Sequence, residues 1–160
     1  RSGMFIDDVG GPPLIDRDRL IVVGGSDRTV SFDIDRGIQA WELPFGGTQM
    51  AWPSAKHYFI ASDDGRLVAV DRDTGGVAWA RSLPKYADAS RLDRVEWYGP
   101  VLAANRLVLA SSTGLLITVS PSTGKLLGRV QNRGGFVAPP VIVENTMLLV
   151  TENGDLIAYK

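Results

Sequence analysis

Short apolar runs, each followed by a glycine-bearing turn, recur along the chain, and one stretch shows the unit most fully. In GRLVAVDRDTGGVAW, residues 65–79, Leu67 and Ala69 would face one side of a strand and the two valines of the run the other. Because both sides are apolar, this pattern predicts a strand buried on both faces within a stack of sheets. The DRDTG that follows predicts a tight turn, since Asp and Thr side chains bond to nearby backbone and Gly75 accepts a positive φ.

The turn glycine is followed four residues later by a tryptophan, and this spacing also recurs. The two pairs are Gly75 with Trp79 and, in TVSFDIDRGIQAWEL, Gly37 with Trp41. A third copy, GLLITVSPSTGKLLGRV, has Gly124 at the turn but Gly128 in place of the tryptophan. A fourth copy begins as GDLIAYK at Gly154. The chain is therefore predicted to repeat one supersecondary unit.

Prolines precede the apolar runs at a spacing that suggests the fold. Pro13, Pro53, Pro100 and Pro140 are separated by 40, 47 and 40 residues. A period near forty with short strands and glycine turns is typical of β-propeller blades. We therefore predict an all-β chain, a partial propeller of about four four-stranded antiparallel blades, and the alternative is a β-sandwich with coincidental turns. The predicted blades cover approximately residues 12–43, 50–83, 97–130 and 137–160.

A polar insertion at residues 84–98 stretches one period to 47. It carries charges of both signs, at Arg91, Asp93, Arg94 and Glu96. The simplest interpretation is an exposed loop between two blades. Insertions on one face of a repeat protein often bind partners, so a binding role stays open.

The composition excludes several function classes. Apolar residues make up 44% of the 160 and charged residues 22%, with a formal net charge of -1, which indicates neither a disordered chain nor a nucleic-acid-binding one. The absence of cysteine excludes disulfides, thiolate metal sites and a cysteine nucleophile. No apolar window is long enough to cross a membrane, and residues 1–11 do not resemble a signal peptide, so any targeting segment is expected upstream.

Few residues carry candidate chemistry. The single histidine, His57, lies in an apolar strand pattern and is interpreted as a packing or surface residue. The run from Asp71 lacks the third ligand and the closing glutamate of a calcium loop, and phosphate-loop and Gly-x-Ser-x-Gly motifs are absent. Trp41 and Trp79 are predicted to be apolar wedges between blades. We therefore predict no catalytic site, no cofactor and no metal.

The repeat AVDRDTGGVAW resembles that of pyrroloquinoline-quinone-type propellers. The chain as a whole resembles the C-terminal half of the BamB family of lipoproteins, which belong to the outer-membrane β-barrel assembly machinery. This resemblance rests on the order of DDVGGPPLI, FGGTQ, WYGPVLAANRLVLASSTGLLITVSPSTGKLLGRV and APPVIVENTMLLVTENGDLIAY, and it covers nearly the whole chain. It implies half of an eight-bladed, non-catalytic scaffold at the periplasmic side of the outer membrane, lipid-anchored upstream, with BamA and unfolded outer-membrane proteins as partners.

The resemblance also implies a site. In the family, an acid-x-acid loop ahead of a blade's first strand contacts the periplasmic domains of BamA. Asp8 matches the first acidic position, Gly10 stands at the second, and Asp7 lies beside them. From the residues alone, Asp7 and Asp8 are equally consistent with a solvated turn before the first strand.

Two other classes stay open: a sensor or adhesion module built from the same blades, and a quinoprotein dehydrogenase fragment. The second resembles the chain less, since such enzymes commonly carry an adjacent cysteine pair over the cofactor. Four blades would leave unpaired edges, so we expect the chain to be a fragment whose copies associate as a two-fold homodimer. A strand at residues 2–6 is a further candidate to complete the last blade.

Overall fold

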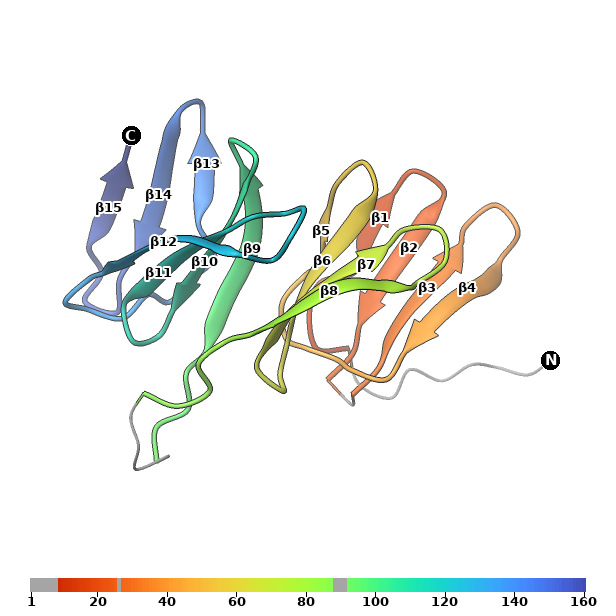
Figure 1. Ribbon diagram of the computed structural model, residues 1–160, viewed down its shortest axis with the longest axis horizontal. Coiled ribbons are helices and arrows are strands. Elements are labelled where there is room, and N and C mark those ends of the chain that lie inside the picture. Colours follow the sequence, from red (N-terminus) through yellow and green to blue (C-terminus); the bar gives the residue numbers. More distant parts are fainter. Residues whose placement is uncertain (1–8, 26, 88–91) are drawn as a thin grey trace. The chain divides into compact units, whose positions relative to one another are not determined.

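The computed structural model describes residues 9–25, 27–87 and 92–160, and its regular structure there is β throughout (Figure 1). Strands that follow one another in sequence pair antiparallel, which gives four separate meandering sheets. This confirms the predicted propeller blades, and the β-sandwich alternative is wrong. The chain divides into two compact units, residues 1–78 and residues 79–160.

Three of the sheets contain four strands and one contains three. The first sheet contains β1 (Leu14–Asp16), β2 (Arg19–Val23), β3 (Thr29–Asp33) and β4 (Ile38–Leu43). The second contains β5 (Trp52–Pro53), β6 (His57–Ser62), β7 (Arg66–Asp71) and β8 (Val77–Ser82). The third contains β9 (Trp97–Ala103), β10 (Arg106–Ser111), β11 (Leu115–Val119) and β12 (Leu126–Gln131). The fourth contains β13 (Val141–Val143), β14 (Thr146–Val150) and β15 (Leu156–Tyr159).

The central strands are buried on both faces, as their continuous apolar runs predict. The four residues Leu67–Val70 of β7 are at most 1% exposed. The face of β7 that carries Val68 and Val70 packs against the first sheet in one core, whose buried members are Ile21, Val23, Trp41, Leu43, Phe45, Ala51, Tyr58, Ile60, Val68 and Val70. Each sheet of this unit therefore supplies one side of a shared apolar layer.

The second unit has an equivalent core between the third and fourth sheets. Its buried members are Val108, Ala110, Leu116, Phe136 and Leu149. Four half-buried residues pack against them, namely Tyr98, Met147, Ile157 and Tyr159. The same stacking of consecutive sheets thus occurs in both units.

Tryptophan and glycine of successive repeats form one contact. The Trp41 ring lies against Gly75, where an added Cβ would come within 2.7 Å of it, and Trp41 Nε1 donates a hydrogen bond to the Arg72 carbonyl at 3.0 Å. Trp79 makes the same contact with Gly124, where an added Cβ would come within 2.6 Å of the ring. Trp79 Nε1 donates a hydrogen bond to the Pro121 carbonyl at 2.9 Å. The prediction that these tryptophans are packing wedges is confirmed, and Gly75 and Gly124 also have to leave room for the ring of the preceding repeat.

Two prolines lie elsewhere than expected, and the first of them, Pro53, ends β5 rather than opening it. Pro100 does not open its strand but lies in the middle of β9, which begins at Trp97. Proline has no N–H to donate, and β9 is an edge strand of its sheet, so the ladder tolerates it there. The register with β10 also shifts between Val108 and Ala110.

Candidate functional site

Four loops of the first unit meet at one end of its sheets. They are the lead at residues 9–11, the β2–β3 hairpin, the link at residues 45–47 and the β6–β7 hairpin, called here the acidic loop cluster. Gly10 N donates to the Val23 carbonyl at 3.1 Å, and Gly47 N donates to that of Gly24 at 3.0 Å. Asp63 N donates to the Gly46 carbonyl at 3.0 Å, so main-chain bonds join all four loops.

Glycines make this close approach possible. A Cβ on Gly46 would overlap the carbonyl oxygen of Gly24, and one on Gly47 would overlap that of Ala61. The second unit repeats the arrangement, because a Cβ on Gly135 would overlap the carbonyl oxygen of Ser112. Loops fixed by backbone contacts of this kind hold their side chains in defined places, which suits a binding surface.

The cluster exposes several carboxylates. Asp27 lies in the β2–β3 hairpin, and Asp63 and Asp64 in the β6–β7 hairpin, all on the surface. Arg66 Nη2 lies 2.5 Å from Asp64 Oδ2, so one of these charges is partly neutralised. Residues 1–78 contain eight Lys or Arg and twelve Asp or Glu, a net charge of -4, and the cluster is part of this acidic half.

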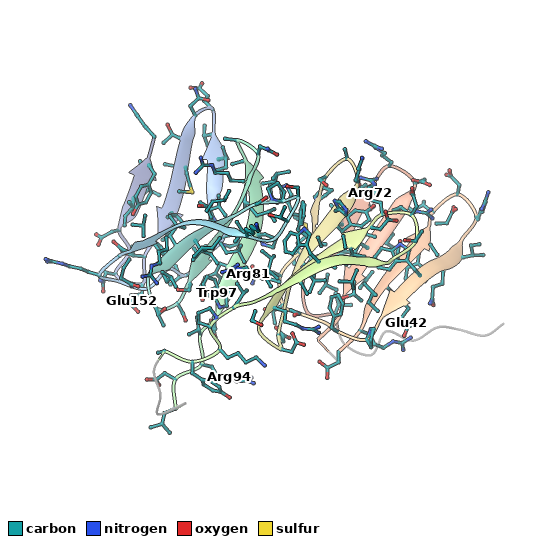
Figure 2. The ribbon with its side chains drawn as sticks, viewed as in Figure 1. Glu42, Arg72, Arg81, Arg94, Trp97 and Glu152 are labelled. Carbon is teal, nitrogen blue, oxygen red and sulfur yellow. The ribbon has the colours of Figure 1, made fainter. Side chains whose placement is uncertain are left out.

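Glu42 of β4, labelled in Figure 2, forms an ion pair with Arg28 of the β2–β3 hairpin. Its Oε1 lies 2.8 Å from Arg28 Nη2, and its Oε2 accepts from Gln39 Nε2 at 3.1 Å. The hydrogen bond from Arg28 holds the pKa of Glu42 below its ordinary value. This carboxylate therefore stays ionised under mildly acidic conditions, although its charge is largely matched by Arg28.

The two predicted contact residues, Asp7 and Asp8, lie outside the described residues. The structure describes the chain immediately after them, where Val9 pairs with Gly24 in an isolated antiparallel bridge. A Cβ on Gly10 would overlap the carbonyl oxygen of Gly47, so this position has no room for a side chain in this fold. Glycine at position 10 therefore has a steric explanation in this fold.

A buried ion pair in the same unit has no signal in the sequence. Arg72 Nη1 lies 2.6 Å from Asp16 Oδ2 and also donates to the Ser54 carbonyl at 2.7 Å. Its guanidinium lies 5.0 Å from the centroid of the Tyr58 ring, and burial raises the pKa of Tyr58 to about 12. The pair joins the first and second sheets, so its role is structural, and no spacing rule pointed to it because Arg72 is a variable position of the turn.

The remaining candidates of the sequence have structural roles. Asp71 Oδ1 accepts hydrogen bonds from Thr74 N at 2.9 Å, Thr74 Oγ1 at 2.8 Å and Asp73 N at 3.1 Å, which confirms the predicted turn. These bonds, first of all that from the Thr74 backbone, hold the pKa of Asp71 below its ordinary value. His57 is half-buried in β6 opposite Asp71. Among the described residues, no three His, Cys, Asp or Glu side chains are placed to hold a metal ion.

The insertion is paired at its base. Val95 N donates to the Lys85 carbonyl at 2.9 Å, and Tyr86 pairs with Arg94, which is labelled in Figure 2. Trp97 closes the insertion by donating its Nε1–H to the Pro84 carbonyl at 2.9 Å. Arg91 lies outside the described residues.

Across the described part of the chain, no helix has the length and hydropathy to span a bilayer.

Comparison with known proteins decides the family. A family model described as outer membrane protein assembly factor BamB matches residues 1–81 and 88–160. This chain belongs to the BamB family. Among curated BamB proteins, that of Alkalilimnicola ehrlichii is 25% identical over 154 residues, which is 96% of this chain but 38% of the relative. The chain thus spans well under half the length of the BamB relatives that it matches.

Solved structures agree on the fold. BamB from Moraxella catarrhalis superposes with a TM-score of 0.80 at 17% identity, over 95% of this chain and 44% of that one. A quinohemoprotein alcohol dehydrogenase from Comamonas testosteroni superposes with a TM-score of 0.71 at 14% identity, over 91% and 29% of the two chains. At these identities the likeness establishes the propeller fold alone, and the same fold occurs in an enzyme and in an assembly factor.

Proposed function

We propose that this chain is a non-catalytic scaffold in the assembly of outer-membrane proteins, acting at the periplasmic side of the outer membrane. Its partner in this proposal is the periplasmic part of BamA, and unfolded outer-membrane proteins are a second class of partner. Membership of the BamB family supports the assembly role. The curated relatives share the description outer membrane protein assembly factor.

The observation that carries the proposed contact is the convergence of acidic loops in the first unit. In the sequence, Asp7 and Asp8 come directly before Val9 and Gly10, which main-chain contacts with Val23 and Gly24 hold in place. Asp63 is fixed beside the same link by its main-chain bond to Gly46. A partner with a basic surface would meet several carboxylates on a rigid support, which favours rapid and specific docking.

The contacts of the ionisable groups favour a binding role over a catalytic one. Among the described residues, the ionisable groups with shifted pKa values are held in contacts within the chain: Asp71 in its turn, Tyr58 in the core, Glu42 with Arg28, Arg66 with Asp64 and Tyr98 with Glu96. A catalytic role would need such a group to face a bound substrate. We therefore propose a binding role and no reaction.

The test is binding of the 160-residue chain to the periplasmic domains of BamA from the same organism. Charge reversals at Asp63 of the acidic loop cluster and at Asp8, which precedes the cluster in the sequence, should each weaken binding about 5-fold to 30-fold, since each loses one favourable charge contact and adds a repulsive one. Raising the salt concentration from about 0.05 to about 0.5 M should also weaken binding, because exposed charges are screened.

Asp73→Arg provides the matched control. Asp73 is an exposed aspartate on the turn after β7, whereas Asp63 lies just before that strand, so the two occupy opposite ends of it. Its reversal makes the same change in net charge and should leave affinity within about 2-fold. Equal losses from Asp63→Arg and Asp73→Arg would mean that only net charge matters. Absence of binding by the folded wild-type chain would refute the BamA contact.

A further inference from the structure

One carboxylate of the acidic loop cluster is held by groups of its own hairpin. Arg66 Nη2 lies 2.5 Å from Asp64 Oδ2, and Ser62 Oγ donates a hydrogen bond to Asp64 Oδ1 at 2.5 Å. Both oxygens of this carboxylate therefore have a partner within the chain. The side chains of Arg66 and Asp64 are 40% and 42% exposed, so the pair lies at the surface, where another protein can reach it.

The guanidinium of Arg66 also contacts the core of the first unit. It lies 5.5 Å from the centroid of the Phe45 ring, and Phe45 is a buried member of that core. Arg66 Nε is buried and has no hydrogen-bond partner among the described residues. A cation over the face of an aromatic ring is attracted by the ring. The contact with Phe45 therefore keeps Arg66 beside Asp64 although the hairpin is exposed.

The turn of this hairpin does not need the ion pair, because two other hairpins form the same turn without it. In each, a glycine with φ between +78° and +83° donates its N–H at 3.0 Å to the carbonyl three residues earlier. These glycines are Gly65, Gly114 and Gly154. The next residue is Arg66 in the β6–β7 hairpin, but it is Leu115 or Asp155 in the other two. Arg66 therefore changes the surface of its hairpin rather than the fold.

We propose that Arg66 is an internal competitor for the basic partner of the acidic loop cluster. While Arg66 holds Asp64, the partner meets a positive charge and a carboxylate whose oxygens are already bonded. A lysine or arginine of the partner has to displace Arg66 before it can pair closely with Asp64. Arg66 thus limits the affinity of this surface and determines which carboxylates the partner uses. This inference rests on the proposed binding role of the cluster.

Binding of the 160-residue chain to the periplasmic domains of BamA gives the first test. Arg66→Leu introduces the residue type found at the equivalent place in the third sheet. It should tighten binding about 3-fold to 10-fold, since it releases Asp64 and removes a like charge. Arg36→Leu is the matched control, because Arg36 lies on the β3–β4 turn with its side chain 76% exposed. It changes the net charge equally and should leave affinity within about 2-fold.

A double variant separates release of the carboxylate from loss of the cation. Arg66→Leu combined with Asp64→Asn has the net charge of the wild type and no carboxylate to release. Its affinity should return to within about 2-fold of the wild type, because the two changes are coupled through the ion pair. A gain as large in the double variant as in Arg66→Leu would overturn the proposal, as would the absence of any gain in Arg66→Leu.

An oligolysine peptide distinguishes failure of this inference from failure of the proposed function. The peptide supplies basic side chains without the shape of BamA. If the wild-type chain does not bind BamA but Arg66→Leu binds the peptide more tightly than Arg36→Leu does, the competitor is retained and the BamA contact is rejected. Equal binding of the peptide by Arg66→Leu and Arg36→Leu would reject the competitor, whatever the result with BamA.

Arg66→Gln covers the case in which the leucine variant fails to fold. Glutamine keeps a polar side chain at the surface but has no charge to pair with Asp64. Its urea denaturation midpoint should stay close to that of the wild type, because an ion pair this exposed contributes little to stability. Arg66→Gln should bind BamA and the oligolysine peptide more tightly than Arg36→Gln does, and equal binding by these two variants would contradict the proposal.

Discussion

The contact between Trp41 and Gly75 predicts that a single methyl group disrupts the first unit. In Gly75→Ala, the added Cβ would lie 2.7 to 2.9 Å from three atoms of the Trp41 side chain. Gly75 also has φ of +73°, a conformation that alanine adopts only with strain. Trp41 is 6% exposed and hydrogen-bonded to the Arg72 carbonyl, so its ring cannot move aside without loosening the core.

Gly37→Ala separates the two contributions. Gly37 occupies the same place in the preceding turn with φ of +66°, but nothing lies within 4 Å of its added Cβ. The left-handed conformation alone should cost about 1 to 2 kcal/mol in either variant. Overpacking against the ring should add about 1 to 3 kcal/mol for Gly75→Ala. We therefore expect Gly75→Ala to lower the unfolding free energy by about 2 to 5 kcal/mol.

Urea denaturation followed by circular dichroism measures both variants, and both substitutions lie in residues 1–78, so they act on the same unit. The difference between their unfolding free energies reports the packing of Trp41 without the backbone strain that the two share. Equal destabilisation by Gly75→Ala and Gly37→Ala would refute the claim that Gly75 has to leave room for the ring of Trp41.

Three further changes test other contacts. Arg72→Met leaves the largely buried Asp16 carboxylate without its cation, and we expect urea denaturation to show a loss of about 3 kcal/mol in unfolding free energy. Gly10→Asp introduces an acidic residue but forces a Cβ into the carbonyl of Gly47, so calorimetry should show a lower melting temperature. Asp71→Asn removes a carboxylate whose folded pKa is depressed below 3.8; its contribution is present above that pH and is lost as pH falls through the lower folded value. The stability deficit of Asp71→Asn in acid titrations should therefore shrink below about pH 3.8, and a deficit independent of pH would contradict this account.

The strands and turns could be predicted because their causes are local. The continuous apolar run that contains Val68 and Val70, the side-chain bonding capacity of Asp71 and the tolerance of Gly75 for positive φ are all properties of neighbouring residues. The spacing of Trp41 and Trp79 also indicated a packing role. What the spacing could not supply was the partner, because Gly75 and Gly124 meet the tryptophan of the preceding repeat only after the sheets have stacked.

The candidate site was only partly accessible to sequence reasoning. Asp7 and Asp8 were identified through family resemblance, and they lie outside the described residues. The role of Asp63 in the same surface depends on the approach of the backbones at Gly24 and Gly46, which no pattern within one strand encodes. The ion pair of Arg72 was missed for the same reason, since its partner lies in a different sheet.

Photo-cross-linking in cells of the source organism tests the assembly role most directly. A photoreactive amino acid at position 63 of the acidic loop cluster should capture BamA, as should one at position 8, whereas the same group at position 73 should not. Capture from positions 8 and 63 alone would support the proposed scaffold and its contact surface. Failure to capture BamA from either position, with the chain present at normal abundance, would contradict the account, as would capture that is equal from position 73.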